Sequence, residues 1–207
     1  MNIVTGYFRQ AGTAARFLVL ATLILGLAYP ATVFGIGQLI APYQANGSIS
    51  RDEGGAPAAS ALLAQAKADD AGAQDPKWFH VRPSAVTWDP ASSSASNLGP
   101  NDAKLRDAVT ANRAAVATTE NVTPAEVPAD AVTASGSGLD PDISPQYARL
   151  QVPRVAAANG LSTATVQDLV DRNTSSGLEA FLGQPAVNVT ALNLDVAAAS
   201  PSSRQPQ

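Results

Sequence analysis

The sequence predicts a single N-terminal transmembrane helix plus one exported mixed α/β domain. A largely apolar run of 20 residues lies close to the N-terminus of the 207-residue chain. The only charged residues before that run are two arginines, and none lies within it. The rest of the chain mixes segments that have helical periodicity and helix caps with short stretches that alternate like strands.

The transmembrane helix is predicted over residues 17–40. From Phe17 to Ile36 the chain reads FLVLATLILGLAYPATVFGI, and 20 helical residues span about 30 Å, the thickness of the hydrocarbon core of a bilayer. A single segment can cross only as a helix, because its backbone polar groups must be paired internally. Tyr29 and Pro30 interrupt the apolar run, and the proline is expected to kink the helix.

The charges beside the helix predict its orientation. Arg9 and Arg16 precede it, whereas the next charged residue in the chain is Arg51. The positive-inside rule therefore places residues 1–16 in the cytoplasm and the main domain outside. The alternative is a cleaved signal peptide with its site at residues 26–28, but the apolar run exceeds the ~7–15 residues of a signal core and continues to Ile40. Under either interpretation the remainder of the chain is exported.

Composition excludes several classes of function. The chain has 13 Lys and Arg against 17 Asp and Glu, a net charge of −4, and this argues against a nucleic-acid-binding surface. It contains no cysteine, which excludes disulfides, thiolate chemistry and Cys-ligated metals. Its one histidine, His80, cannot form a multi-histidine metal site, and a lone histidine beside aromatic residues is more often structural than catalytic.

The exported part is interpreted as a linker at residues 41–57, an α/β domain at residues 58–195 and a disordered tail at residues 196–207. Residues 42–207 carry a net charge of −6 and few aromatic residues, so we expect a core of small aliphatic side chains. Helices are predicted over Ala58–Lys67, from Asn101 to about Ala117, from Ser144 to near Gly160 with a bend or restart at Pro153, and from Ser162 onward. Strands are predicted over Trp78–Arg82, Ala131–Ala134 and Ala186–Leu194.

Motifs for nucleotide binding or catalysis are missing from the sequence. No G-x-x-x-x-G-K-[ST] loop occurs, and the Gly-rich stretch at residues 135–138 lacks the lysine, so we interpret it as a turn. A Ser–His–Asp arrangement would have to use His80. Asp140 and Asp142 flank a proline, where turn formation is a simpler explanation than a calcium site that needs six or more oxygens.

A long motif at residues 132–145, Val-Thr-Ala-Ser-Gly-Ser-Gly-Leu-Asp-Pro-Asp-Ile-Ser-Pro, resembles the signature of the KdpC family, the C subunit of the bacterial potassium-transporting Kdp P-type ATPase. Further motifs follow in the family's order at residues 44–48, 78–85, 96–100, 151–156 and 183–189, so the resemblance runs from about Phe17 to Asp195. Two loops depart from the pattern. Ser94-Ala95 stands in place of the usual Gly-Gly, and Asp142 stands where many relatives carry His.

The resemblance implies an accessory subunit in the bacterial inner membrane, with no catalytic, cofactor-binding or metal-binding residues of its own. ATP, Mg²⁺ and potassium would be handled by channel-like and ATP-hydrolysing partner subunits. Family descriptions call this subunit a catalytic chaperone that raises the ATP affinity of the pump subunit. The sequence agrees with an accessory role, because one helix makes no potassium path and neither a T-V-G-Y-G filter nor an Asp-Lys-Thr-Gly phosphorylation motif occurs.

The family motifs also supply candidate residues for structure or for partner contact: Arg82, Ser84, Asn97, Ser135, Ser137, Asp140, Arg154 and Asn188. Both arginines are expected to pair internally with carboxylates such as Asp140. The partners expected are the two other kinds of Kdp subunit and the lipid bilayer, with no nucleic acid. A membrane-anchored exported binding domain unrelated to transport remains the alternative, and the neighbouring genes would distinguish the two.

Overall fold

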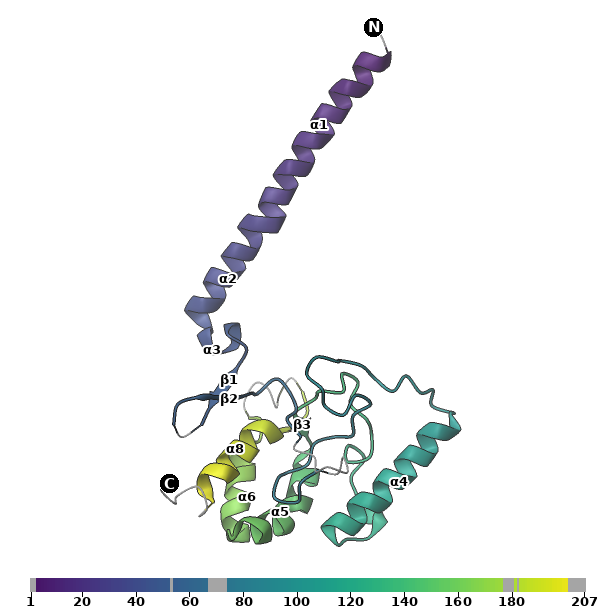
Figure 1. Ribbon diagram of the computed structural model, residues 1–207, viewed down its shortest axis with the longest axis vertical. Helices are drawn as coiled ribbons and strands as arrows, with labels where there is room; N and C mark the ends of the chain where they lie inside the picture. The colour runs from purple at the N-terminus through teal and green to yellow at the C-terminus, as the bar shows by residue number, and fades with distance from the viewer. Residues whose placement is uncertain (1–2, 53, 67–73, 177–180, 182, 201–207) are drawn as a thin grey trace. The chain divides into compact units, whose positions relative to one another are not determined.

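The computed structural model describes residues 3–52, 54–66, 74–176, 181 and 183–200 (Figure 1). The chain divides into two compact units, residues 1–48 and residues 49–207. The first unit contains a long apolar helix and the second a mixed α/β domain, in agreement with the predicted combination of elements.

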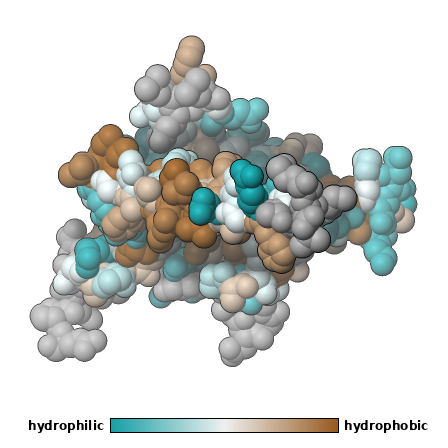
Figure 2. Space-filling view, turned by 90° about the horizontal axis from the view of Figure 1, so that it is seen from above, coloured by the Kyte–Doolittle hydropathy of each residue, from teal (hydrophilic) through white to brown (hydrophobic). Residues whose placement is uncertain are grey.

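The first unit is built around one continuous helix. Helix α1 (Ile3–Leu23) passes into a π-helical turn, η1 (Ile24–Ala28), and continues as α2 (Tyr29–Ile40). The most apolar stretch of Gly6–Ile40 has a mean hydropathy of 2.1, so this helix is long and apolar enough to cross a membrane. Its apolar side chains are exposed and contribute to the band of brown residues in the space-filling view of Figure 2.

A π-helical turn precedes Pro30, at which the sequence predicted a kink. A proline inside a helix lacks the N–H for the carbonyl four residues earlier, which is that of Gly26, and its ring clashes with that carbonyl. The wider turn accommodates this, because the Tyr29 N–H donates to the carbonyl of Ile24, five residues back.

A short helix closes the first unit, where the sequence predicted a linker. Helix α3 (Pro42–Ala45) is followed by a turn in which the Tyr43 hydroxyl donates to the carbonyl of Ser48 at 3.0 Å. The side-chain amides of Gln38 and Asn46 pair with each other at 3.1 and 3.3 Å.

Side-chain caps begin the described helices of the α/β domain. The capping residues are Asp102 for α4 (Ala103–Glu120), Ser144 for α5 (Pro145–Asn159), Ser162 for α6 (Thr163–Arg172) and Asn188 for α8 (Val189–Ala199). The predicted caps at Ser144 and Ser162 are confirmed, whereas the cap of α4 lies one residue after the predicted Asn101 and the helix ends beyond Ala117. Pro153 lies on an exposed position inside α5, which neither ends nor restarts there.

The strands within the described residues are short and form two antiparallel pairs. Strand β1 (Ile49–Arg51) pairs with β2 (Pro57–Ser60), and β3 (Asp142–Ile143) pairs with β4 (Val187–Asn188). A single 3₁₀ turn, η2 (Pro124–Glu126), is closed by a capping box between Thr123 and Glu126. Ser144, the cap of α5, directly follows β3, and Asn188, the last residue of β4, is the cap of α8. The pairing of β3 with β4 therefore brings the starts of both helices close together.

The core consists of small aliphatic side chains, as predicted. Helix α6 contacts both α5 and α8, and α5 also contacts α4, an arrangement that Figure 1 shows. The fully buried residues are largely valines and one leucine: Val155, Val166, Val170, Val187, Val196 and Leu192. Tyr147 on α5 is a large buried aromatic side chain in this core.

The helix predicted at Ala58–Lys67 is wrong. Residues 57–60 form β2, and the described residues that follow, up to Ala66, are irregular. Tertiary contacts override the helix propensity of this alanine-rich stretch. The N–H of Ala64 donates to the carbonyl of Leu139 at 2.8 Å, and the carbonyl of Leu63 accepts from the Thr190 hydroxyl at 2.7 Å.

The strand predicted at Trp78–Arg82 is also wrong. The backbone N–H and C=O groups of residues 79 and 80 are hydrogen-bonded to side-chain amides instead of to a neighbouring strand. The Asn193 amide accepts from the Phe79 N–H at 2.8 Å and donates to the Phe79 carbonyl at 3.0 Å. The Gln151 amide does the same for His80, at 2.6 and 3.2 Å. Two carboxamides on α8 and α5 therefore take the place of a neighbouring strand and satisfy the backbone of a buried segment.

Three further predictions need correction. Residues 131–134 form a turn, in which the Thr133 N–H donates to the Ala129 carbonyl. The strand predicted over Ala186–Leu194 is reduced to β4, because the Asn188 side chain caps a helix that starts at the next residue. Val196 is fully buried and α8 continues to Ala199, so the predicted disordered tail is wrong up to Ser200, and residues 201–207 lie outside the described residues.

Candidate functional site

The signature motif at residues 132–145 contains a turn at residues 135–140, called the signature turn below, that is held by its own serines. The Ser135 side-chain oxygen accepts from the N–H groups of Gly138 at 3.0 Å and Asp140 at 3.3 Å. The Ser137 oxygen accepts from the Leu139 N–H at 3.1 Å. Serine hydroxyls commonly stabilise turns in this way. The Gly-rich stretch at residues 135–138 is therefore a turn, as predicted, whereas the end of the motif forms β3 and the cap of α5.

A second segment, residues 82–94, wraps around this turn. The Ser84 hydroxyl donates to the carbonyl of Gly138 at 2.8 Å and accepts from the N–H groups of Val86 and Trp88, each at 3.1 Å. The N–H of Ser94 donates to the Ser137 carbonyl at 3.0 Å. Ser84 thus organises its own loop and fastens that loop to the signature turn.

Arg82 connects the same two segments through an ion pair. Its guanidinium lies 3.0 Å from the carboxylate of Asp140, and further N–H groups donate to the carbonyls of Thr133 at 3.4 Å and Ala134 at 3.5 Å. The side chains of Arg82 and Asp140 are 25% and 31% exposed, so solvent screens the pair. The predicted pairing of Arg82 with Asp140 is present.

Asn188 joins the signature turn to helix α8. Its amide nitrogen donates to Asp142 at 3.1 Å and to the Ala61 carbonyl at 2.8 Å, while its oxygen caps α8 by accepting from the Ala191 N–H at 2.9 Å. Asp142 in turn donates its N–H to Asp140 at 3.0 Å. The structure therefore gathers six of the candidate residues into one group, the signature cluster: Arg82, Ser84, Ser135, Ser137, Asp140 and Asn188.

Asn97 stands outside the signature cluster. It is exposed and adopts a left-handed conformation with φ of 54°. No hydrogen bond within the described residues joins its side chain to the cluster.

Arg154 belongs to a second group on α5, the buried arginine cluster of Arg154, Glu120, Gln151 and His80. The Arg154 Nε donates to both carboxylate oxygens of Glu120 at 3.0 Å, and its other nitrogens donate to the carbonyls of Pro76 and Trp78 and to Gln151. The side chain of Glu120 is 1% exposed and that of Arg154 is 11% exposed. Burial raises the pKa of Glu120, while the hydrogen bond and positive charge of Arg154 oppose that rise.

His80 lies beside this ion pair in its neutral form. Its backbone is paired with Gln151, and its ring Nε2 lies 3.1 Å from the carbonyl of Asp75. Burial, reinforced by the positive charge of Arg154, lowers the pKa of His80 from 6.5 to about 4. The imidazole is therefore uncharged at neutral pH.

This pKa predicts acid destabilisation of the domain. Because the unfolded chain binds a proton near pH 6.5 and the folded chain only near pH 4, stability should fall as the pH drops through that window, by ~3 kcal/mol in total. The raised pKa of Glu120 has the opposite slope above pH 4.5 and reduces the net change. Thermal unfolding of the full chain in detergent, measured from pH 7 to pH 4, should show the loss in the wild type. The H80Q variant should lack it, and an identical pH profile would contradict this assignment.

The polar side chains of both clusters bind the domain's own backbone and one another. The His80 ring nitrogen faces a carbonyl rather than a serine hydroxyl, so the arrangement contains no Ser–His pair. Among the described residues no group of three or more His, Asp or Glu side chains could hold a metal ion. The hydrogen bonds and ion pairs of the two clusters therefore serve to fix the conformation of the loops that they join.

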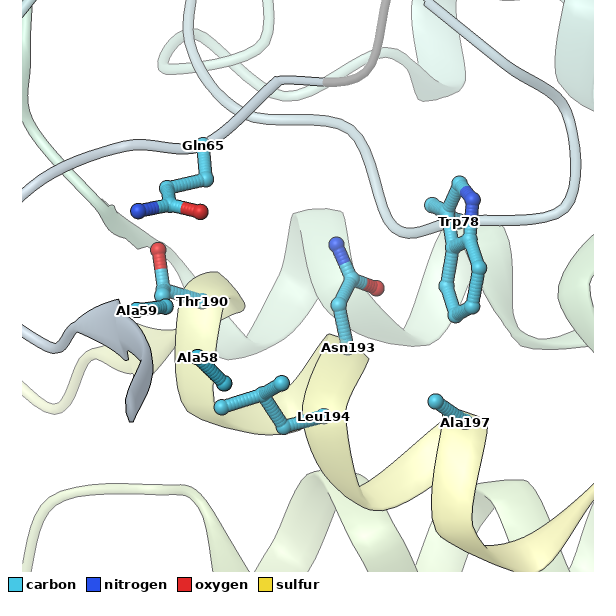
Figure 3. A pocket seen from close by; sticks show the side chains of 8 residues that line it. All are labelled: Ala58, Ala59, Gln65, Trp78, Thr190, Asn193, Leu194 and Ala197. Atoms are coloured by element: carbon cyan, nitrogen blue, oxygen red, sulfur yellow. The ribbon is translucent and has the colours of Figure 1, made fainter. Parts of the chain in front are cut away.

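A cavity of about 220 Å³ opens between β2, the segment that contains Trp78, and α8. Figure 3 shows Trp78 and Gln65 on one side, facing Thr190, Asn193 and residues of the same helix. The described residues that line it carry no charge, so they offer no counter-charge for the phosphates of a nucleotide. The described residues that line it are Ala58, Ala59, Gln65, Trp78, Thr190, Asn193, Leu194 and Ala197.

Several residues that build these clusters or hold the segments beside them were missed by sequence reasoning. Glu120 and Asn193 lie 34 and 114 residues from their hydrogen-bond partners, and nothing in the sequence links them. Gln151 could have been found, because it precedes Arg154 by three residues in a helix whose cap was recognised, and that spacing places both on one face. Asp130, which accepts from the N–H and hydroxyl of Ser144, carried no signal.

The fold and these clusters define a class of protein: an α/β domain with internally paired polar loops, preceded by one apolar helix. The model of the family described as "KdpC: K+-transporting ATPase, c chain" matches residues 11–198, so the chain belongs to the KdpC family. It is similar to the potassium-transporting ATPase KdpC subunit of Kineococcus radiotolerans, with 46% identity over 96% of this chain and 98% of that protein. The KdpC subunits of Caulobacter vibrioides and Caldanaerobacter subterraneus are 48% and 42% identical, over 84% and 87% of this chain and 85% and 91% of their own lengths.

Proposed function

We propose that the chain is a single-pass accessory subunit that assembles with the channel-like and ATP-hydrolysing subunits of a potassium-uptake ATPase and stabilises their complex. The observation that carries this proposal is the combination of an exposed apolar helix with a domain whose polar clusters are paired internally. Such a chain offers neighbouring proteins a membrane contact and a rigid shape. Its relatives are named as subunits of a potassium-transporting ATPase.

We assign the N-terminus to the cytoplasm and the α/β domain to the outer side of the inner membrane. Arg9 and Arg16 are exposed near the start of the apolar helix, and no charged residue follows until Arg51. In this orientation a bilayer separates the domain from cytoplasmic ATP. An effect on the ATP affinity of the pump subunit would then be transmitted through the assembled complex and not by contact with the nucleotide.

The charge of the domain suits a position over the outer entrance of the channel-like subunit. Residues 42–207 carry a net charge of −6, which attracts cations within the ~8–10 Å that screening allows at physiological ionic strength. Above a potassium entrance, such a domain would raise the local concentration of the ion while it holds the complex together.

Single-cysteine labelling tests the orientation, because the chain has no cysteine of its own. S92C places the reporter on an exposed loop of the domain, and Q10C places it near the start of the apolar helix. In intact spheroplasts a membrane-impermeant maleimide should label S92C, whereas Q10C should react only after permeabilisation. Co-purification tests the assembly. The chain, carrying an affinity tag and extracted from native membranes, should retain the channel-like and ATP-hydrolysing subunits. Inverted labelling, or a chain that is monodisperse and free of partners, would refute the proposal.

A further inference from the structure

The π-helical turn leaves the backbone carbonyl of Leu25, in the apolar helix, without a backbone donor. In an α-helix this carbonyl would accept from the N–H of Tyr29, but that N–H donates to the carbonyl of Ile24. In a π-helix the donor for Leu25 would be residue 30, which is a proline and has no N–H. The hydroxyl of Thr32, a nearby polar side chain, donates to the carbonyl of Ala28 instead.

This unpaired carbonyl lies deep within the apolar part of the helix. No charged residue occurs between Phe17 and Ile40, and Leu25 lies ~12 Å along the helix from the first of these residues and ~22 Å from the second. In the hydrocarbon core no water is present to donate to such a carbonyl, so it must be satisfied by protein. Among the described residues of the first unit no side-chain hydrogen bond reaches the Leu25 carbonyl, and of the nearby hydroxyls that of Thr32 is bonded to Ala28.

A second polar group lies on the same side of the helix at the same depth. Tyr29 follows Leu25 by four residues, a spacing that brings both to one face. Its side chain is 65% exposed, and its hydroxyl can donate and accept. Beside them, Gly26 has only a methyl group of Thr22 near its missing side chain, at 3.8 Å, so a second helix can approach the backbone closely.

We propose that the Leu25 carbonyl and the Tyr29 hydroxyl form the docking surface for a transmembrane helix of a partner subunit, which presents a hydroxyl or carboxamide side chain that donates to the Leu25 carbonyl. The proposal rests on the proposed function, which places this helix in a bilayer beside other subunits. A second copy of this chain could reach the Leu25 carbonyl only with its Thr22 or Tyr29 hydroxyl, because its helix carries no carboxamide at this depth and its Thr32 hydroxyl is already bonded. Cross-linking distinguishes this pairing from the proposed one.

Two substitutions test the surface independently in the complex extracted from native membranes. P30A restores an N–H, which allows a regular helix and removes the unpaired carbonyl. Y29F removes only the hydroxyl. Each should lower the amount of partner subunits retained by the tagged chain after a stringent detergent wash at least fivefold. L27A and A31V are matched controls, because residues two positions away from Leu25 and Tyr29 lie on the opposite side of the helix, and they should retain the wild-type amount.

Photo-cross-linking locates the partner directly. A benzophenone attached to V33C, four residues after Tyr29, should cross-link to a partner subunit, and the same reporter on A31C should not. The inference is overturned if P30A and Y29F both retain partners as the wild type does, if only A31C cross-links, or if V33C cross-links to a second copy. Those results leave the proposed function intact as long as the wild-type chain retains its partners. A wild-type chain that retains none refutes the proposed function itself.

Discussion

Replacing Gly138 with alanine is expected to destabilise the α/β domain by about 2–5 kcal/mol, a large fraction of the ~5–15 kcal/mol by which domains are typically stable. Gly138 adopts φ of 72°, a conformation that costs an alanine ~1–2 kcal/mol. An added Cβ would also lie 2.6 Å from a methyl group of Val86, 2.8 Å from the carbonyl oxygen of Ser94 and 3.2 Å from the Ser84 hydroxyl. Since one of these neighbours is backbone, the clash cannot be relieved by a change of rotamer.

Gly136 offers the matched control in the same turn. A Cβ added at this residue would have nothing within 4 Å, and the residue has no positive φ, so G136A should change stability by less than about 0.5 kcal/mol. Thermal unfolding of the full chain in detergent, followed by near-ultraviolet circular dichroism, separates the two variants. If G136A and G138A lowered the stability equally, the close contacts around Gly138 would not be the reason why a glycine is needed there.

The same turn shows how far the sequence can lead. Its position and its turn character were predictable, because Gly, Ser, Asp and Pro in series determine local backbone geometry. The caps at Ser144 and Ser162 were predictable for the same reason. All of these signals are local, as is the apolar run of the N-terminal helix.

The parts that the sequence did not predict depend on contacts between distant residues. Residues 79 and 80 look like part of a strand, but Asn193 and Gln151 supply the hydrogen bonds that a neighbouring strand would have supplied. The stretch after Ala58 has the composition of a helix, but its backbone is bonded to the signature turn. No pattern within a short window reveals a partner that lies 71 or 114 residues away.

Replacing Arg154 with methionine is expected to cost about 3–5 kcal/mol, because the variant leaves the carboxylate of Glu120 buried without a counter-charge. The Glu120 side chain is 1% exposed, and both of its carboxylate oxygens accept from the Arg154 Nε. R154M also removes the donors to the carbonyls of Pro76 and Trp78. R82M is the control, since the Arg82–Asp140 pair is partly exposed and should contribute only ~0–1 kcal/mol.

The dependence of this effect on pH identifies its cause. Burial already raises the pKa of Glu120 in the wild type, and loss of the arginine should raise it further. For a carboxyl whose pKa is raised on folding, stability falls as the pH increases from the unfolded value of 4.5 through the folded value. R154M should therefore be least destabilised below pH 4.5, where Glu120 is protonated, and the double variant R154M/E120M should be more stable than R154M at neutral pH. R154M could instead lose the same stability below pH 4.5 as at neutral pH, with no recovery in the double variant. That result would mean that Arg154 acts through packing and its contacts with carbonyls rather than through its charge.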